Sequence, residues 1–137
     1  MTDKLIPLRI AGVGYSLPET VITNDDLTKL YETSDEWIYT RTGIKERRVV
    51  SGEQNAIDLG LEAAQNALAK AKMNPEEIDL ILAASSAPPD LYPAIACHIQ
   101  SRLGITKPIP AFDITAACSG LIYGLSIAKA YIASGMY

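Results

Sequence analysis

The segment from residue 109 to residue 132 constrains the fold of this chain more than any other stretch of its sequence. The apolar run from Ile109 to Ile114 has the length and composition of a buried strand. A turn of small residues, Thr115–Ala117, follows the run, and Cys118 comes next. Beyond it, apolar residues recur at helical spacing, at Leu121, Leu125, Ala128 and Ile132. The segment therefore predicts a strand, a tight turn and a helix, with Cys118 at the junction.

The position of Cys118 allows two interpretations. The free N–H groups and the dipole of a helix N-terminus favour a negatively charged sulfur, and the small neighbouring side chains would admit a substrate carbonyl. Such a cysteine could be a nucleophile. Free cysteine is also among the most buried residue types, so a structural role in the core is the alternative. Position alone leaves both interpretations open.

The rest of the chain alternates expected strands and helices. The first strand is expected over Leu8–Tyr15, where Gly12-Val13-Gly14 indicates close backbone packing rather than a nucleotide-binding loop. Later elements are a helix starting at Thr23 or Asn24, a short helix capped by Ser34 and ended by Gly43, a long helix over Ile57–Met73, a strand over Asp79–Ala84 and a helix over Ala94–Leu103. This order is typical of a layered α/β fold with a largely parallel sheet.

Composition and charge exclude several classes of protein. The 137 residues carry a formal net charge of −4, which gives no support for nucleic-acid binding. The two cysteines, Cys97 and Cys118, cannot form a disulfide framework, and no Cys-x-x-Cys pair suggests zinc. Residues 1–4 lack the profile of a signal peptide, and no apolar run approaches the roughly 20 residues that a membrane span needs. A reducing, cytoplasmic setting fits this pattern best.

Three stretches of the sequence resemble β-ketoacyl-acyl-carrier-protein synthase III, the initiating condensing enzyme of type II fatty acid synthesis. They are Thr33–Ile44, Tyr92–Gln100 and Ala111–Gly120, in the order and at the spacing of that family. The resemblance implies a thiolase-like layered α/β fold, with a mostly parallel mixed sheet and helices on both faces. It also implies that residues 1–137 form an incomplete N-terminal half-domain, whose C-terminal half is absent from this sequence.

The resemblance implies roles for particular residues. Cys118 matches the nucleophile that accepts the acyl group. Trp37 and Arg41, with Thr33 near the adenine, match positions that bind coenzyme A; a half-buried tryptophan beside a solvated arginine is the alternative. Tyr92 matches a position, often phenylalanine, that crosses the dimer interface and lines the partner's acyl pocket. A structural role is preferred for Cys97 and for the sole histidine, His98, over a catalytic one for His98, because the family places its histidine elsewhere. Arg47 and Arg48 are either a phosphate contact or a solvated charge cluster.

The expected function is the transfer of an acyl group from acyl-CoA to Cys118, followed by decarboxylative condensation with malonyl-acyl-carrier protein. No metal or redox cofactor is expected, because coenzyme A enters only as a thioester substrate. The expected assembly is a homodimer in the cytoplasm, without nucleic-acid or membrane partners. The alternatives are a related condensing enzyme of secondary metabolism and an inactive fragment or dimerising subunit. The family's catalytic histidine and asparagine are expected beyond residue 137, so the 137 residues alone are expected to be inactive.

Overall fold

A computed structural model describes residues 8–137 of the chain, and Met1–Lys4, the segment tested for a signal peptide, lies outside the described residues. The chain divides into two compact units. The smaller unit is Ser16–Asn55. The larger unit contains the described residues through Tyr15 together with Ala56–Tyr137. Cys118 lies in the larger unit and Trp37 in the smaller one.

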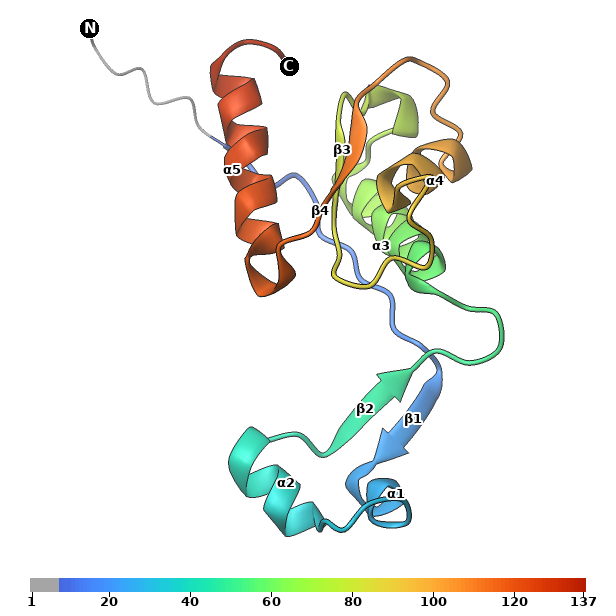
Figure 1. The fold of residues 1–137 in the computed structure, drawn as a ribbon. Coiled ribbons are helices and arrows are strands. Elements are labelled where there is room, and N and C mark those ends of the chain that lie inside the picture. Colours follow the sequence, from blue (N-terminus) through green and yellow to red (C-terminus); the bar gives the residue numbers. More distant parts are fainter. Residues whose placement is uncertain (1–7) are drawn as a thin grey trace, which may run out of the picture. The chain divides into compact units, whose positions relative to one another are not determined.

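The smaller unit is a two-stranded antiparallel ribbon with two short helices (Figure 1). Strands β1 (Thr20–Thr23) and β2 (Glu46–Val49) pair with Thr20 opposite Val49 and Thr23 opposite Glu46. Helices α1 (Asn24–Thr28) and α2 (Asp35–Thr42) lie in the connection between the two strands. No local pattern in the sequence predicts this ribbon, because its strands are four residues long and β2 is highly charged.

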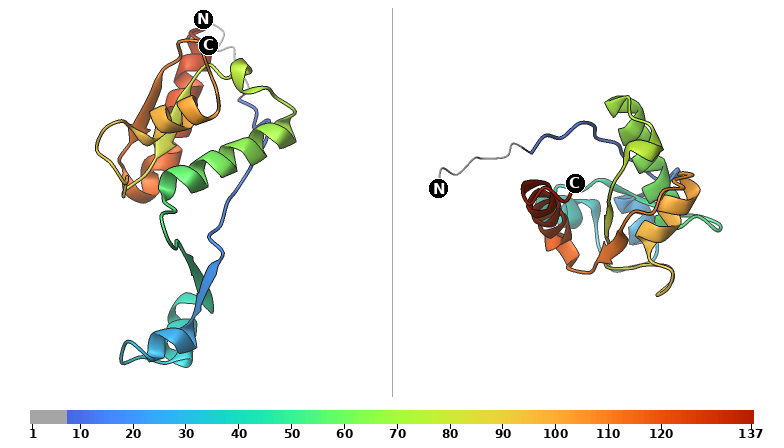
Figure 2. Two further views of the ribbon diagram at one scale, coloured as in Figure 1. Left: turned by 90° about the vertical axis from the view of Figure 1, so that its right-hand side faces the viewer. Right: turned by 90° about the horizontal axis from the view of Figure 1, so that it is seen from above.

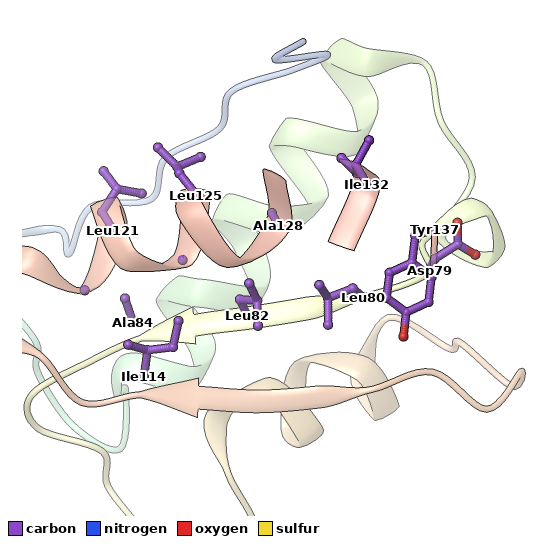
Figure 3. A pocket seen from close by; sticks show the side chains of 12 residues that line it. Asp79, Leu80, Leu82, Ala84, Ile114, Leu121, Leu125, Ala128, Ile132 and Tyr137 are labelled. Carbon is purple, nitrogen blue, oxygen red and sulfur yellow. The ribbon is translucent and has the colours of Figure 1, made fainter. Parts of the chain in front are cut away.

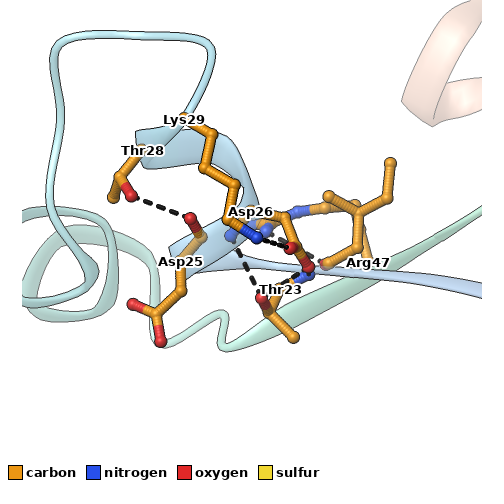
Figure 4. A network of polar contacts seen from close by, with 7 residues as sticks. Thr23, Asp25, Asp26, Thr28, Lys29 and Arg47 are labelled. Carbon is orange, nitrogen blue, oxygen red and sulfur yellow. Dashed lines mark hydrogen bonds and ion pairs between the residues drawn. The ribbon is translucent and has the colours of Figure 1, made fainter.

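The start of α1 follows the local rules that predicted it. Thr23 accepts a hydrogen bond from the Asp26 N–H, and the Asp26 carboxylate accepts one from the Thr23 N–H, which forms a capping box. Lys29 Nζ reaches the same carboxylate at 2.8 Å (Figure 4). Of the two candidate caps, Thr23 and Asn24, Thr23 is the one that caps α1.

Helix α2 also begins and ends where the sequence indicated. Ser34 accepts a hydrogen bond from the Trp37 N–H at 3.1 Å and caps the first turn. Gly43 ends the helix with φ of 70°, a left-handed conformation that glycine adopts without steric cost. Only Ile38 of this helix is buried, so most of its surface, including Trp37, remains exposed.

The larger unit contains a parallel strand pair with helices on both sides (Figures 1 and 2). Strands β3 (Ile81–Ala84) and β4 (Ala111–Ile114) pair in register, with Ile81 opposite Ala111. Helices α3 (Ala56–Ala71) and α4 (Ile95–Arg102) lie on one side of the pair, and α5 (Gly120–Ala133) lies on the other. The parallel α/β architecture predicted from the sequence is confirmed.

Side chains of β3 alternate between the two layers. Ile81 and Ala83 pack against the core made by Ile57 of α3 and by Ile95 and Ile99 of α4. Leu82 and Ala84 face a groove beneath α5 instead. A strand that is apolar on both faces needs cover on both faces, which explains the continuous apolar run at this point of the sequence.

The expected strand over Leu8–Tyr15 is wrong, because no residue of this segment belongs to a strand in the described structure. The segment instead runs along α3. A Cβ atom on Gly12 would collide with the carbonyl oxygen of Ala67, and one on Gly14 would collide with that of Ala63. The two glycines therefore allow a close approach to the helix, which confirms the packing interpretation of Gly12-Val13-Gly14.

Candidate active site

Cys118 lies in a short turn between β4 and α5. The turn is a 3-10 helix, η2 (Ala117–Ser119), and the sulfur-bearing residue is exposed. Ala117 has φ of 44°, a left-handed conformation that is strained for a residue with a Cβ atom. The sequence predicted this junction between strand and helix, and the structure places Cys118 in the short turn directly before α5.

Hydrogen bonding around the turn leaves a donor beside the sulfur. The N–H groups of Ser119 and Gly120 donate to the carbonyls of Ala116 and Ala117. Within the described residues, the Cys118 N–H has no such acceptor. Ser119 makes no side-chain cap on α5. An unpaired N–H next to a nucleophile can stabilise the oxyanion that forms when a thioester carbonyl is attacked.

Gly120 permits the tight exit from this turn. It is buried, and a Cβ atom added to it would lie 2.9 Å from the Cβ of Ala84. The first residue of α5 therefore packs directly against the end of β3, and a larger side chain would push the turn away from the strand pair. The position of Cys118 depends on this contact.

Asp113 connects the strand before Cys118 to helix α4. Its two carboxylate oxygens accept hydrogen bonds from the N–H groups of Ile95 and Ala96 at 2.8 and 2.9 Å. Ala94, the N-cap residue, provides no side-chain bond, so Asp113 caps α4 from a neighbouring strand. Sequence reasoning missed this role, and the signal was a single carboxylate inside an otherwise apolar strand.

The remaining candidate in the larger unit, Tyr92, lies in the segment that leads into α4. Its side chain is 84% exposed and belongs to none of the helices or strands. This exposure is compatible with the dimer-interface role that the resemblance implies and also with an unpaired loop aromatic. The assignment of Tyr92 to an acyl pocket stays a prediction.

Trp37 and Arg41 share one face of α2, as their spacing predicted. Trp37 is 53% exposed, and the Arg41 guanidinium lies over its ring. Arg41 Nη1 also donates to the carbonyl of Trp37 at 3.4 Å. Thr33 is half-buried just before the N-cap Ser34. An exposed indole next to a guanidinium can stack on a nucleobase and contact a phosphate.

The other singled-out residues have structural contacts. Arg47 Nη2 donates to Asn24 Oδ1 at 2.7 Å, and Arg48 Nη1 donates to the carbonyl of Pro18 at 3.1 Å. Cys97 Sγ contacts the carbonyl oxygen of Ala111 at 3.4 Å, on the β4 side of α4. His98 Nε2 is enclosed and has no hydrogen-bond partner within residues 8–137. Arg47 and Arg48 are therefore held by hydrogen bonds within the smaller unit rather than forming a purely solvated cluster. The contact of Cys97 favours its structural interpretation.

An apolar groove of about 750 Å³ lies between α5 and the strand pair (Figure 3). Its lining residues are mostly aliphatic and include Leu80, Leu82, Ile114, Leu121, Leu125 and Ile132. Cys118 lies outside this lining. In the part of the chain that the structure describes, no cluster of three or more His, Cys, Asp or Glu side chains could hold a metal ion. None of the helices within residues 8–137 has the length and hydropathy needed to span a membrane.

The chain is similar to known proteins in sequence and in structure. The family described as 3-Oxoacyl-[acyl-carrier-protein (ACP)] synthase III matches residues 112–137, which include Cys118. The β-ketoacyl-[acyl-carrier-protein] synthase III of Chlamydia trachomatis serovar D is 52% identical over 128 residues, or 93% of this chain and 39% of the relative. The chain spans about two-fifths of the length of the curated relatives it matches.

Solved structures give the same result. The crystal structure of 3-oxoacyl-[acyl-carrier-protein] synthase III from Aquifex aeolicus matches with a TM-score of 0.88 and 48% identity, over 93% of this chain and 41% of that one. A priming β-ketosynthase of a polyketide biosynthetic pathway matches with a TM-score of 0.87 and 33% identity, over 93% and 38% of the two chains. Both similarities extend over both units of the chain.

Proposed function

Since these 137 residues correspond in sequence and fold to the N-terminal part of a β-ketoacyl-[acyl-carrier-protein] synthase III, we propose that their protein catalyses the initiating condensation of type II fatty acid synthesis. The observation that carries the proposal is Cys118 on its strained turn, exposed and beside an unpaired N–H. This arrangement suits a nucleophile that stores an acyl group between two half-reactions.

In the first half-reaction, the Cys118 thiolate attacks the carbonyl carbon of an acyl-CoA. The Cys118 N–H stabilises the oxyanion of the tetrahedral intermediate. Collapse of the intermediate breaks the bond to the coenzyme A sulfur, which leaves as a thiolate and takes up a proton. The acyl group then remains on Cys118 as a thioester.

In the second half-reaction, malonyl-acyl-carrier protein loses carbon dioxide and becomes a carbanion. The carbanion attacks the acyl carbonyl on Cys118, and the cysteine leaves to give 3-oxoacyl-acyl-carrier protein. The resemblance assigns the stabilisation of this carbanion to a histidine and an asparagine beyond residue 137. The chain of residues 1–137 supplies the nucleophile, and Asp113 and Gly120 hold the elements around it.

Coenzyme A is proposed to bind at the exposed face of α2. The Trp37 indole would stack on the adenine, Arg41 would meet the phosphates and Thr33 would lie near the base. The 53% exposure of Trp37 supports this role, because a tryptophan held for packing alone would bury more of its ring. No metal or redox cofactor takes part in the proposed reaction.

The protein is further proposed to act as a cytoplasmic homodimer, with acyl-carrier protein as its macromolecular substrate. Tyr92 would contribute to the dimer interface, and its high exposure in a single chain supports that role. Dimerisation can be measured by analytical ultracentrifugation of the complete protein. Tyr92→Ala should weaken the dimer or change the preferred acyl chain.

The similarity to the priming β-ketosynthase supports a second candidate, a condensing enzyme that starts a polyketide. The same Cys118 chemistry would apply with a different acyl-CoA. Both candidates predict that Cys118 is acylated, but they differ in the acyl-CoA that acylates it. Measuring the acylation of Cys118 with acetyl-, branched and longer acyl-CoA donors therefore separates them. Absence of acylation with every donor would contradict both.

A further inference from the structure

The smaller unit contains a buried amide where an apolar core would be expected. Asn24 is 1% exposed and is the one buried polar residue among those the structure describes. Ile38 is the only buried residue of α2, the helix that carries Trp37 and Arg41. Because so little apolar surface holds α2, its polar contacts decide where the helix lies.

The Asn24 side chain donates to both ends of α2. Its Nδ2 group donates to Asp35 Oδ1 at 2.7 Å and to the carbonyl oxygen of Ile44 at 2.8 Å. Asp35 is the first residue of α2, and Ile44 follows Gly43, its C-cap. One amide therefore fixes the start and the end of the same helix.

The side-chain oxygen of Asn24 connects α2 to the β1–β2 ribbon. Asn24 Oδ1 accepts a hydrogen bond from Arg47 Nη2 at 2.7 Å, and Arg47 Nη1 donates to the carbonyl of Ile22 at 3.3 Å. The Asn24 N–H donates to the carbonyl of Lys45 at 3.1 Å. Only a side-chain amide offers two donors and an acceptor together in this space, so aspartate or leucine could not replace it.

We propose that Asn24 is a positioning residue, which fixes α2 on the β1–β2 ribbon and so sets the affinity of Trp37 and Arg41 for the nucleotide portion of acyl-CoA. The inference rests on the proposed function, in which these two residues bind coenzyme A. The hydrogen bonds of Asn24 reach the ends of α2 and not the two side chains, so Asn24 acts through the helix backbone.

The test compares Asn24→Asp with the double variant Asn24→Asp, Asp35→Asn in the complete protein. The single change places two carboxylates together, whereas the double change restores a donor and an acceptor between positions 24 and 35. Calorimetry gives the dissociation constant for coenzyme A. Acylation of Cys118 is followed with acetyl-CoA and with an acetyl thioester that lacks the nucleotide.

The single variant should bind coenzyme A roughly tenfold more weakly. The double variant should recover part of that loss, because the bond between positions 24 and 35 is restored while the Ile44 carbonyl still lacks its donor. Acylation by the short thioester should stay within about twofold of wild type in both, because that donor does not use the α2 face. Asn66→Ala is the matched control: its Nδ2 donates to the carbonyl of Tyr15 in the larger unit, and its loss should leave coenzyme A affinity unchanged.

Three outcomes would overturn the inference. The first is a folded Asn24→Asp protein that binds coenzyme A with wild-type affinity. The second is an equal loss of acylation rate with acetyl-CoA and with the short thioester, which would indicate a general structural role. If the wild type is acylated by the short thioester but does not bind coenzyme A, the proposed binding role fails first and the inference falls with it. If circular dichroism shows that Asn24→Asp is unfolded, the test uses Asp35→Ala, which removes one hydrogen-bond partner of Asn24. This variant must weaken coenzyme A binding without slowing acylation by the short thioester.

Discussion

The guanidinium of Arg41 lies over the indole of Trp37, with the Arg41 Cζ atom 4.4 Å from the ring centroid. Arg41 therefore occupies one face of the ring in this structure, and an adenine can stack on the opposite face. The guanidinium on the first face adds a positive charge beside the ring. The pair thus gives the proposed coenzyme A site a stacking group and a charge.

Trp37→Ala should weaken coenzyme A binding by about 1–3 kcal/mol, because it removes a surface on which a base stacks. Acylation of Cys118 by a thioester without the nucleotide should be nearly unchanged. Calorimetry and donor-dependent acylation rates measure the two effects. Tyr39→Ala is the matched control, since Tyr39 is also exposed on α2 but lies two residues from Trp37 and faces another direction. Equal losses with both donors would identify Trp37 as a folding residue.

Cys118 should be the sole residue acylated in the complete protein. It is exposed on the strained turn, whereas Cys97 contacts the carbonyl of Ala111 on the inner side of α4. Incubation with radiolabelled acetyl-CoA, followed by digestion and peptide mapping, locates the label. Cys118→Ala should abolish labelling and Cys97→Ala should retain it. Label on Cys97, or label that survives Cys118→Ala, would contradict the proposed mechanism.

Gly14→Ala should destabilise the larger unit by about 1–3 kcal/mol, because the new Cβ atom would meet the backbone of α3 at Ala63. Thermal and denaturant unfolding of the complete protein measure the change. The control is Gly124→Ala in α5, where the added Cβ would lie 3.5 Å from Ile114 Cδ1, an ordinary contact. That control should be neutral or stabilising, since alanine is a better helix former than glycine. Equal stabilities for the two variants would rule out close packing of the 8–15 segment on α3.

Asp26 should make stability depend on pH in the acid range. The hydrogen bond from Lys29, together with those from the Thr23 hydroxyl and N–H, holds the pKa of Asp26 well below its usual 3.8. The folded state therefore binds fewer protons at this site than the unfolded chain does. The resulting stabilisation is complete above about pH 5 and is lost progressively as the pH falls toward the folded-state pKa.

Unfolding midpoints measured between pH 7 and pH 2 test this expectation. Asp26→Asn should lower the midpoint at pH 7, and its difference from wild type should shrink toward pH 2. The control is Asp25→Asn, whose carboxylate makes none of the capping contacts (Figure 4). A difference between Asp26→Asn and wild type that is independent of pH would show that the carboxylate charge is not responsible.

Residues 1–137 expressed by themselves should form no condensation product and should associate. Several apolar side chains of α5 are exposed in the described chain, with Leu121 at 66% and Ile122 at 59%. Exposed apolar surface of this extent promotes association in water. Size-exclusion chromatography and a condensation assay, with and without the complementary C-terminal part of a synthase III relative, measure both effects. A monomer that unfolds cooperatively would contradict the first expectation, and 3-oxoacyl product from residues 1–137 alone would contradict the second.

The starts of α1 and α2, the end of α2 and the place of Cys118 could be predicted from the sequence, because short-range interactions decide them. The Thr23 and Ser34 caps each bond to an N–H three residues away, and Gly43 needs only its own conformational freedom. The apolar runs at β3 and β4 likewise indicated strands covered on both faces. The residue roles at Cys118, Trp37 and Tyr92 came from resemblance to a family, and local chemistry alone left them open.

The tertiary structure decided the features that depend on residues far apart in the chain. Leu8–Tyr15 looks like a strand, but a strand requires a partner, and this segment packs on α3 instead. Asn24 bonds to groups 11, 20 and 23 residues away, and Asp113 caps a helix that begins 18 residues earlier. No local pattern distinguishes Asn24 from a solvated asparagine, because burial is set only when the separate elements pack together and their polar groups must find partners away from water.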